Sequence, residues 1–403
     1  MLNVEKIRAD FPMFSNNPKM IYLDNACTTF KPKPVLQSMN DYYEKFSACA
    51  GRSQHFLGKY AEQLFEQARK DISDFVHCKP EEVVFTKNCT EAINLVANAY
   101  PFSSSKNQVL TTVLEHHSMF LPFYQQAQAK KIELKIMNPS QEGLFTQTNW
   151  SEEISEQTGL VAIHGMNNTL STQPDSEKIV KAAHAKNAKV LVDGAQLIPH
   201  TDFNFKKSDV DFLAFSGHKM VGPTGIGCLI AKKELLEKLN PFLVGGETIE
   251  SVSLNQVIYT KAPHKFEAGI QNYSGAIGLA AACKYLKKIG LKNIEVQEQN
   301  LMKILLSETS KISNFKLIGP SNAAQRNGIL TFNLGNAHPH EVAIMLDSLN
   351  KVCVRSGVFC AQPGMTFLGY PDGAVRASLY LYNSEQDIQV FLDTLKKVSK
   401  IVS

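Results

Sequence analysis

The middle of the chain alternates short apolar runs with amphipathic stretches. Short apolar runs bounded by polar turns predict buried strands, and apolar positions three and four apart predict helices. We expect strands at 82–86, 108–112, 160–164, 189–193, 211–215 and 227–231. We expect helices at 90–99, 118–129, 176–186 and 232–239. This alternation predicts an α/β fold with a mostly parallel sheet and helices on both faces.

The pattern changes in the last third of the chain. Helical periodicity is strong over 273–289 and 292–312, short strands are expected at 328–332, 352–355 and 375–378, and an amphipathic helix is expected at 384–399. A short helix at 4–10 is expected to pack on this region. A chain of 403 residues exceeds the size of a single core. We therefore predict a large α/β domain over 18–260 and a smaller α+β domain from 1–17 and 290–403, joined by a long helical segment around 272–289.

Polar residues follow two of the expected strands. One strand runs into Asp193-Gly194-Ala195-Gln196, and another into Ser216-Gly217-His218-Lys219. Ligands of such sheets bind at the carboxyl ends of the strands. A lysine that can form a Schiff base and an aspartate that keeps a pyridine nitrogen protonated suit pyridoxal phosphate, with Ser216 and His218 beside its phosphate and ring. Either motif alone fits ordinary buried strands, but both in this order favour the cofactor.

Composition narrows the possible partners and compartment. Apolar residues make up 44% and charged residues 20%, and the net charge of +4 comes without a basic block, so no nucleic-acid partner is expected. No apolar run reaches the roughly 18 residues of a membrane span. The eight cysteines include no CxxC pair. We expect reduced thiols, a cytoplasmic location and no metal site.

Several motifs together resemble a known family. Asp193-Gly194-Ala195-Gln196, Ser216-Gly217-His218-Lys219, Phe266-Glu267-Ala268-Gly269 and the stretch from Arg355 to Pro363 resemble the class V aminotransferase fold. They are most similar to type II cysteine desulfurases, the branch that serves the SUF iron–sulfur pathway. Further matches, from Tyr22-Leu23-Asp24-Asn25 to Arg376-Ala377-Ser378-Leu379, extend over nearly the whole chain.

This resemblance implies a fold, a reaction and partners. The fold is the fold type I of pyridoxal-phosphate-dependent transferases. The reaction converts L-cysteine to L-alanine, leaves a persulfide on the protein and passes that sulfur to an acceptor protein. The enzyme is expected to be a homodimer with pyridoxal 5'-phosphate as its cofactor.

The resemblance also implies roles for individual residues. Lys219 would bind the cofactor covalently and then move the α-proton of the substrate. Asp193 would pair with the pyridine nitrogen, Gln196 would donate to the ring hydroxyl, and His116 would stack on the ring face.

Two further cofactor contacts have alternatives. Thr90 opens an expected helix, where a threonine is a common cap, but a helix N-terminus also binds anions. Given the lysine, we favour Cys89 and Thr90 as backbone donors to the phosphate. Counting back from Asp193 selects Asn168 for a contact near the ring oxygen, and counting forward from His164 selects Asn167. We favour Asn168, because the turn after it matches the family best.

Cys360 decides the reaction. Desulfuration needs a thiolate that attacks the sulfur of the substrate, and such a thiol must be accessible and close to cations. Cys360 lies in a loop between Gly357 and Pro363, downstream of Arg355. The family often has two histidines before this cysteine, and this chain has Val358 and Phe359 there.

Two arginines and a histidine are candidates for the substrate. Arginine offers a planar, permanently charged fork for a carboxylate, and we favour Arg376 over Arg355, with an internal ion pair as the alternative for Arg376. His55 matches a family histidine near the substrate. The Phe266–Gly269 motif is expected to come from the neighbouring subunit of a dimer. Ile270 follows it where the family commonly has a threonine that contacts the phosphate.

Other functions compete with desulfuration. Selenocysteine lyase activity is a close variant, and transamination, epimerisation or another carbon–sulfur lyase reaction would use the same fold. A catalytically weak binding protein is a third class, against which the presence of Lys219, Asp193, Gln196 and Cys360 argues.

Overall fold

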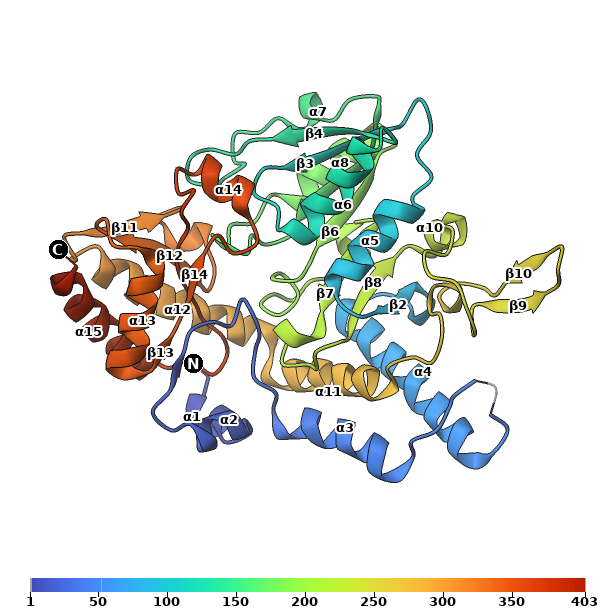
Figure 1. Ribbon diagram of the computed structural model, residues 1–403, viewed down its shortest axis with the longest axis horizontal. Coiled ribbons are helices and arrows are strands. Elements are labelled where there is room, and N and C mark those ends of the chain that lie inside the picture. The colour runs from blue at the N-terminus through green and yellow to red at the C-terminus, as the bar shows by residue number, and fades with distance from the viewer. Residues whose placement is uncertain (1, 52, 403) are drawn as a thin grey trace.

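A seven-stranded sheet forms the centre of the molecule (Figure 1). The computed structural model describes residues 2–51 and 53–402. The strand order is β2-β8-β7-β6-β5-β3-β4, and every neighbouring pair is parallel except those of β8, which is antiparallel to β2 and β7. The strands are β2 (Val83–Thr86), β3 (Gln108–Thr112), β4 (Glu133–Met137), β5 (Thr158–His164), β6 (Lys189–Asp193), β7 (Phe212–Ser216) and β8 (Gly227–Ala231). The predicted α/β fold with a mostly parallel sheet is confirmed.

Helices cover both faces of this sheet because its strands are apolar on both sides. In β5, Leu160 and Ala162 pack in one hydrophobic cluster and Val161 and Ile163 in another. The first cluster includes residues of α5 (Cys89–Ala99), α6 (His117–Gln128) and α10 (Lys233–Lys238). The second includes residues of α8 (Ser176–Ala185), α4 (Phe56–Val76) and α11 (Tyr273–Ile289). Short helices α7 (Trp150–Glu153) and α9 (Phe205–Ser208) lie in the connections.

Several elements of this region were not expected from the sequence. Strand β4 lies at the sheet edge, where Glu133 and Lys135 interrupt the apolar run that marks a buried strand. Strands β9 (Ile249–Val252) and β10 (Val257–Tyr259) form an antiparallel hairpin that projects from the body (Figure 1). Helices α3 (Lys33–Lys45) and α4 pack against α11, whose predicted bounds are confirmed.

The C-terminal part is built on a second sheet, of order β11-β12-β15-β14, with every pair antiparallel. Its strands are β11 (Phe315–Ile318), β12 (Ile329–Leu334), β14 (Arg355–Gly357) and β15 (Ala374–Ser378). Around it lie α12 (Leu291–Thr309), α13 (Pro339–Asn350), α14 (Gln362–Phe367) and α15 (Glu385–Ile401). The strand predicted at 352–355 is two strands, because β13 (Val352–Cys353) pairs with β1 (Ile21–Tyr22) and β14 with β15.

The N-terminal helix joins this C-terminal part, as predicted. In α1 (Val4–Arg8), the guanidinium of Arg8 pairs with Asp387 of α15, and its Nε donates to the carbonyl oxygen of Tyr382 at 2.8 Å. The short helix α2 (Pro12–Asn16) follows. The division into two domains stays a prediction.

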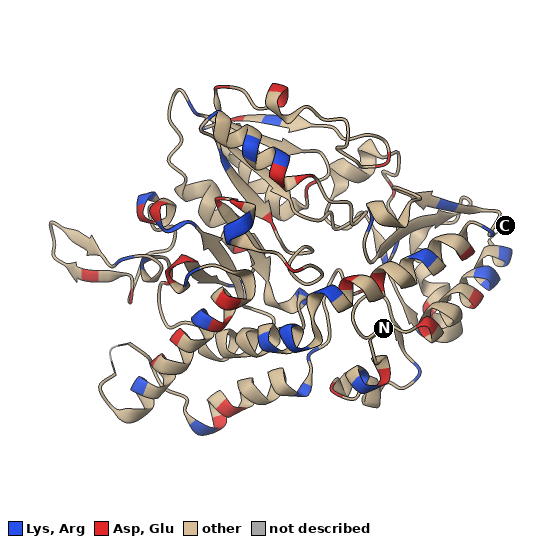
Figure 2. Cartoon of the chain, turned by 180° about the vertical axis from the view of Figure 1, so that it is seen from behind, with Lys and Arg blue, Asp and Glu red and all other residues tan. Residues whose placement is uncertain are grey.

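Charged side chains are spread over the molecule. Basic and acidic residues are interspersed over the face seen from behind (Figure 2). Among the helices of the described residues, none combines the length and the apolar character needed to cross a membrane.

Candidate active site

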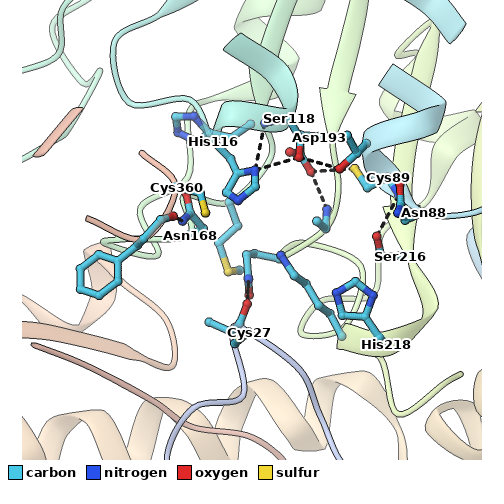
Figure 3. Close-up of a pocket in the computed structure, with 18 of the residues that line it drawn as sticks. Cys27, Asn88, Cys89, His116, Ser118, Asn168, Asp193, Ser216, His218 and Cys360 are labelled. Carbon is cyan, nitrogen blue, oxygen red and sulfur yellow. Dashed lines mark hydrogen bonds between the residues drawn. The ribbon is translucent and has the colours of Figure 1, made fainter. Parts of the chain in front are cut away.

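One pocket collects most of the predicted site residues. It has a volume of about 220 Å³ and lies where β5, β6 and β7 end and where α5 and α6 begin (Figure 3). It is lined by Ala26, Cys27, Asn88, Cys89, Thr90, His116, Ser118, His164, Met166, Asn168, Asp193, Ala195, Gln196, Ser216, His218, Lys219, Arg355, Phe359, Cys360 and Arg376. Side chains from the large sheet and from the C-terminal sheet therefore meet in one cavity.

Lys219 and Asp193 are brought into this pocket by neighbouring strands. Strand β6 ends at Asp193, and β7 leads into the 3-10 turn Gly217–Lys219. Burial lowers the pKa of Lys219, and Asp193 opposes that shift. No hydrogen bond to the Lys219 amine is present among the described residues. A buried amine with a lowered pKa has a larger neutral fraction, which is the nucleophilic form.

One of the two carboxylate oxygens of Asp193 accepts hydrogen bonds from other residues of the chain. The backbone N–H of Ala195 donates to Oδ1 at 2.9 Å, and the Cys89 thiol donates to the same oxygen at 3.2 Å. Within residues 2–51 and 53–402, Oδ2 has no such donor. The second oxygen is thus left for a donor that enters the pocket.

His116 lies at the N-terminus of α6 with a defined orientation. Its Nδ1 accepts from the backbone N–H of Ser118 at 3.1 Å, so the proton of the neutral ring is on Nε2. Burial, with a contribution from the nearby Lys219, lowers the pKa of His116 to about 4. The ring is therefore neutral at physiological pH, and a neutral ring can stack on a cofactor and donate from Nε2.

The start of α5 is a candidate anion site, and one of the two backbone donors expected from the sequence already has a partner. The backbone N–H of Cys89 donates to Ser216 Oγ at 2.8 Å, so its contact with a phosphate stays a prediction. The N–H of Thr90 carries no bond among the described residues, as expected in the first turn of a helix. The Thr90 hydroxyl is 2.7 Å from that of Ser118. Ser216 and His218 lie on the side of the pocket where Cys89 begins α5 (Figure 3), and Thr90 also lines the pocket. An anion there would face the helix N-terminus.

The two candidate asparagines have different surroundings. Asn168 lines the pocket, and its Nδ2 donates to the carbonyl oxygen of Phe359 at 2.9 Å. Asn167 does not line the pocket; its Nδ2 donates to Leu114 and its Oδ1 accepts from the backbone of the following turn. The geometry therefore favours Asn168, and Asn167 has the alternative role of fixing a turn.

The side-chain amide of Gln196 uses its nitrogen in a hydrogen bond, but its oxygen has no partner. Its Nε2 donates to the carbonyl oxygen of Ala26 at 2.7 Å, and its buried Oε1 has no partner. Gln196 is one of the residues that line the pocket. A ligand hydroxyl could satisfy its remaining N–H and its oxygen, because a hydroxyl both donates and accepts.

Cys360 lies on the opposite side of the pocket from Cys89 and Ser216 (Figure 3). Its side chain is exposed, as the reaction requires. The backbone N–H of His117 donates to the Cys360 carbonyl oxygen at 2.7 Å, and the N–H of Gln362 donates to the His117 ring. Phe359 and Cys360 both have a positive φ of 54°. The loop is thus tightly tied to α6, and it presents the thiol to the cavity.

Arg376 and Arg355 are cross-strand neighbours at the same wall. They are directly paired in the β14–β15 register, and both line the pocket. Arg376 is 4% exposed; its Nη1 donates to the carbonyl oxygen of Asn168 at 2.8 Å, and its Nη2 is 3.4 Å from Asp24 Oδ1. The Phe359 ring lies 5.0 Å from its guanidinium carbon. Since like charges directly opposite one another are unfavourable, an anion between the two arginines would be stabilising.

Two residues that the sequence analysis assigned to an active site, His55 and Glu267, do not line this pocket. His55 caps α4, accepting from the N–H of Gly58, and it is exposed away from the pocket lining, so its substrate role stays a prediction. Glu267 pairs with the buried Arg69 at 2.7 Å in the same chain. Glu267 is therefore part of the core of its own chain, whereas Ile270 is 67% exposed. That this motif serves a neighbouring subunit stays a prediction.

Some lining residues were missed from the sequence. Cys27 was expected to be structural, yet it lines the pocket. Ser118 contacts both His116 and Thr90, and nothing in its local sequence distinguishes it from a helix-capping serine. His164 ends β5 beside Asp193 in the register, a strand-end signal that could have identified it. Within the described part of the chain, no group of three or more His, Cys, Asp or Glu side chains could hold a metal ion.

The residues present fit pyridoxal phosphate on several independent grounds. The Lys219 amine is buried without a hydrogen bond in the described residues, Asp193 has an oxygen left over, and Gln196 Oε1 is buried without a partner. A helix N-terminus with a free N–H lies at one end, and a neutral histidine lies at one side. These groups match the aldehyde, ring nitrogen, hydroxyl, phosphate and ring face of the cofactor.

Comparisons with known proteins agree with this architecture. Residues 21–391 match the family model for the aminotransferase class-V family, whose members depend on pyridoxal phosphate. A protein of Streptomyces coelicolor named "Probable cysteine desulfurase" is 38% identical, with 99% of this chain and 97% of that protein covered. A "Cysteine desulfurase" of Escherichia coli O8 is 37% identical, with 99% of each covered. The solved apo structure of the cysteine desulfurase from Thermococcus onnurineus NA1 superposes with a TM-score of 0.93 and 39% identity, with 99% of both chains covered. The chain therefore belongs to the aminotransferase class-V family.

Proposed function

We propose that this protein is a pyridoxal-phosphate-dependent cysteine desulfurase that converts L-cysteine to L-alanine and forms a persulfide on Cys360. The observation that carries this proposal is the shared pocket: the exposed Cys360 thiol lies on the same cavity as the buried pair of Lys219 and Asp193. The lysine amine is common to all pyridoxal-phosphate reactions of the fold, so the thiol is the group that distinguishes desulfuration from the others.

The cofactor would be held by residues from several elements. Lys219 would bind its aldehyde, Asp193 Oδ2 would accept from its ring nitrogen, and the N–H of Thr90 would donate to its phosphate, with Ser216 and His218 alongside. Gln196 and Asn168 would face the ring oxygen, and His116 the ring. When bound, the cofactor supplies an electron sink that weakens bonds at the α-carbon of an amino acid.

The substrate carboxylate would lie against Arg376, with Arg355 at the rim. Lys219, once displaced by the substrate amine, would be the base that takes the α-proton and later returns a proton to the product carbon. His116 Nε2 is a second proton donor at the same cavity. These roles need no rearrangement of the strands that carry them.

Sulfur transfer would occur at Cys360. Its thiolate attacks the substrate sulfur, a sulfur–sulfur bond forms, and the carbon–sulfur bond of the substrate breaks. The electron pair of that bond stays with the carbon side, which takes up a proton and leaves as alanine. The substrate sulfur remains as a persulfide on Cys360 until a thiol accepts it.

Partners and location follow from the same proposal. A protein thiol would accept the sulfur at the rim, in the type II manner linked to iron–sulfur cluster assembly, in the cytoplasm. A homodimer is supported by the β9–β10 hairpin, whose Val252, Leu254, Val257 and Ile258 are exposed, because a projecting apolar hairpin favours a partner surface.

One experiment tests the proposal. Purified protein is incubated with pyridoxal phosphate and L-cysteine, with and without a thiol reductant, and alanine, sulfide and keto acid are measured. We expect alanine with sulfide, and mass spectrometry after one turnover without reductant should find added sulfur on Cys360. Mercaptopyruvate without sulfide would instead establish transamination, and sulfide with pyruvate would establish a carbon–sulfur lyase.

Two variants separate the roles of the amine and the thiol. Lys219→Ala should lose the visible absorption of the bound cofactor. Cys360→Ala should keep that absorption and respond spectrally to cysteine, but make little alanine. Cys283→Ala is a matched control, because that thiol is buried in α11 and does not line the pocket. Parent-level turnover by Cys360→Ala would contradict the proposal.

A further inference from the structure

The thiol of Cys89 has no part in the function proposed so far, yet it touches the centre of the site. Cys89 is 4% exposed at the first position of α5, and Asn88 before it caps the helix. Its thiol donates to Asp193 Oδ1 at 3.2 Å, and its backbone N–H donates to Ser216 Oγ at 2.8 Å. One residue thus ties the helix to the ends of both β6 and β7.

The two donors on Asp193 leave the carboxylate with a single useful orientation. Ala195 N–H and the Cys89 thiol both occupy Oδ1, and they approach from different elements. A carboxylate held at one oxygen by two donors cannot rotate without losing both bonds. Oδ2 is consequently fixed toward the cavity that Lys219 also lines.

The Cys89 thiol is suited to be a donor and not a nucleophile. Burial, together with the adjacent carboxylate of Asp193, raises the pKa of Cys89 well above its ordinary value. It therefore stays protonated at physiological pH and keeps its hydrogen on Asp193. A thiol is a weak donor, so it orients the carboxylate while withdrawing little of its negative charge.

We propose that Cys89 is a positioning residue for Asp193: its thiol fixes the carboxylate and, as a weak donor, preserves the basicity of the oxygen that faces the cofactor ring nitrogen. This rests on the cofactor assignment of the proposed function but not on the desulfuration step. The role is separate from the phosphate contact expected of the Cys89 backbone, whose N–H donates to Ser216 Oγ in this structure.

Replacement by alanine and by serine gives opposite changes at Asp193. Cys89→Ala removes a donor, so the carboxylate is held only by Ala195, and cofactor affinity should fall about threefold to tenfold. Cys89→Ser supplies a stronger donor in nearly the same volume, which stabilises the charged carboxylate and makes it a weaker acceptor for the ring nitrogen.

The test measures cofactor affinity and the state of the ring nitrogen, not turnover. Dissociation constants of pyridoxal phosphate are measured by equilibrium dialysis. The ¹⁵N resonance of ring-labelled cofactor is recorded bound to the parent protein and to Cys89→Ser. We expect the resonance in Cys89→Ser to move toward that of a free protonated pyridine, because a weaker acceptor leaves the proton closer to nitrogen.

Cys228→Ala is the matched control, since this thiol is equally buried, in β8, and does not line the pocket. It should leave both readouts at the parent values. Unchanged affinity in Cys89→Ala together with an unchanged resonance in Cys89→Ser overturns the inference while the proposed function stands. If the parent protein itself takes up no pyridoxal phosphate, the proposed function and this inference both fail. Should Cys89→Ala not fold, the serine variant alone decides through its resonance.

Discussion

Replacing Arg376 by alanine should weaken cysteine binding far more than replacing Arg355. Arg376 is nearly fully buried and is held by Asn168 and Asp24, which fixes its fork in one place. Arg355 is exposed on the facing strand. A fixed, desolvated fork loses little entropy when it grips a carboxylate, whereas an exposed arginine must be ordered and desolvated first.

The expected losses of binding free energy for Arg376→Ala and Arg355→Ala differ clearly. Removing one partner of a buried charged contact costs roughly 2–5 kcal/mol, which corresponds to about a 30-fold to several-thousand-fold rise in the cysteine concentration needed for half-saturation. An exposed pair is worth about 0–1 kcal/mol, at most roughly a fivefold rise. Steady-state alanine production and the spectral change on adding cysteine give this concentration independently. Arg376→Lys should lie between the parent and Arg376→Ala, because it keeps the charge but loses the fork.

The unfolding free energy of Arg376→Ala should depend on pH in a way that separates a loss of fold stability from a loss of substrate binding. Burial raises the pKa of Asp24, and Arg376 and Arg355 partly offset that rise. Without Arg376 the pKa of Asp24 rises further, so the charged carboxylate destabilises the fold at neutral pH. That cost should shrink as the pH falls and Asp24 takes up a proton. Denaturant unfolding at several pH values measures it, and cysteine affinity equal to the parent's in a folded Arg376→Ala would refute the carboxylate role.

Three further predictions follow from the site and the core. Phe359→Leu removes a ring from the Arg376 guanidinium, worth about 0.5–2 kcal/mol, and should raise the half-saturating cysteine concentration about 2-fold to 30-fold, while Phe359→Tyr should not; equal values for both variants would contradict this contact. Glu267→Gln leaves the buried Arg69 underpaired and should cost about 3 kcal/mol of unfolding free energy in denaturant titrations, against a far smaller loss for Glu308→Gln, whose carboxylate is partly exposed in its pair with Lys311. Burial raises the pKa of Glu267, but Arg69 and the hydrogen bonds around it hold it below the usual value, so this contribution is complete at neutral pH and fades as the pH falls through the folded pKa of Glu267. Rapid-quench assays with cysteine alone should show about one alanine per active site followed by a slow phase, because the short tied loop of Cys360 cannot carry the persulfide away; linear alanine formation from the start excludes release as the slow step.

The residues that follow strands could be predicted to meet, because the carboxyl ends of parallel strands lie along the same edge of the sheet. Asp193 and Lys219 follow two consecutive strands, β6 and β7, and these strands pair in parallel in the sheet. Strand β4 was missed for the opposite reason: at the sheet edge its polar side chains replace the apolar run that marks a central strand. A continuous apolar run marks a strand that is buried on both faces, and an edge strand such as β4 lacks such a run.

Contacts between distant segments could not be read in the same way. Arg355 and Arg376 face each other only because β14 and β15 pair in one particular antiparallel register, and a shift by one residue would turn one of them to the other face. The expected location of His55 near the substrate came from the resemblance, yet its side chain caps α4 away from the pocket of its own chain. Position along the sequence gives the strand end, but only the register and the packing of helices give the neighbours.

Phe359 and Cys89 each contact a charged residue of the site and do not take over its role. Phe359 covers the guanidinium of Arg376, and Cys89 donates to Asp193. Both neighbours alter how strongly a charged group is held: a ring stabilises a cation without neutralising it, and a thiol orients a carboxylate without strongly competing for it. Ile270, in contrast, is exposed outside this pocket, so within one chain it has no route to the site. Substitutions at Phe359 and Cys89 should therefore shift affinities for substrate and cofactor separately, whereas an effect of Ile270 on either would require a second subunit.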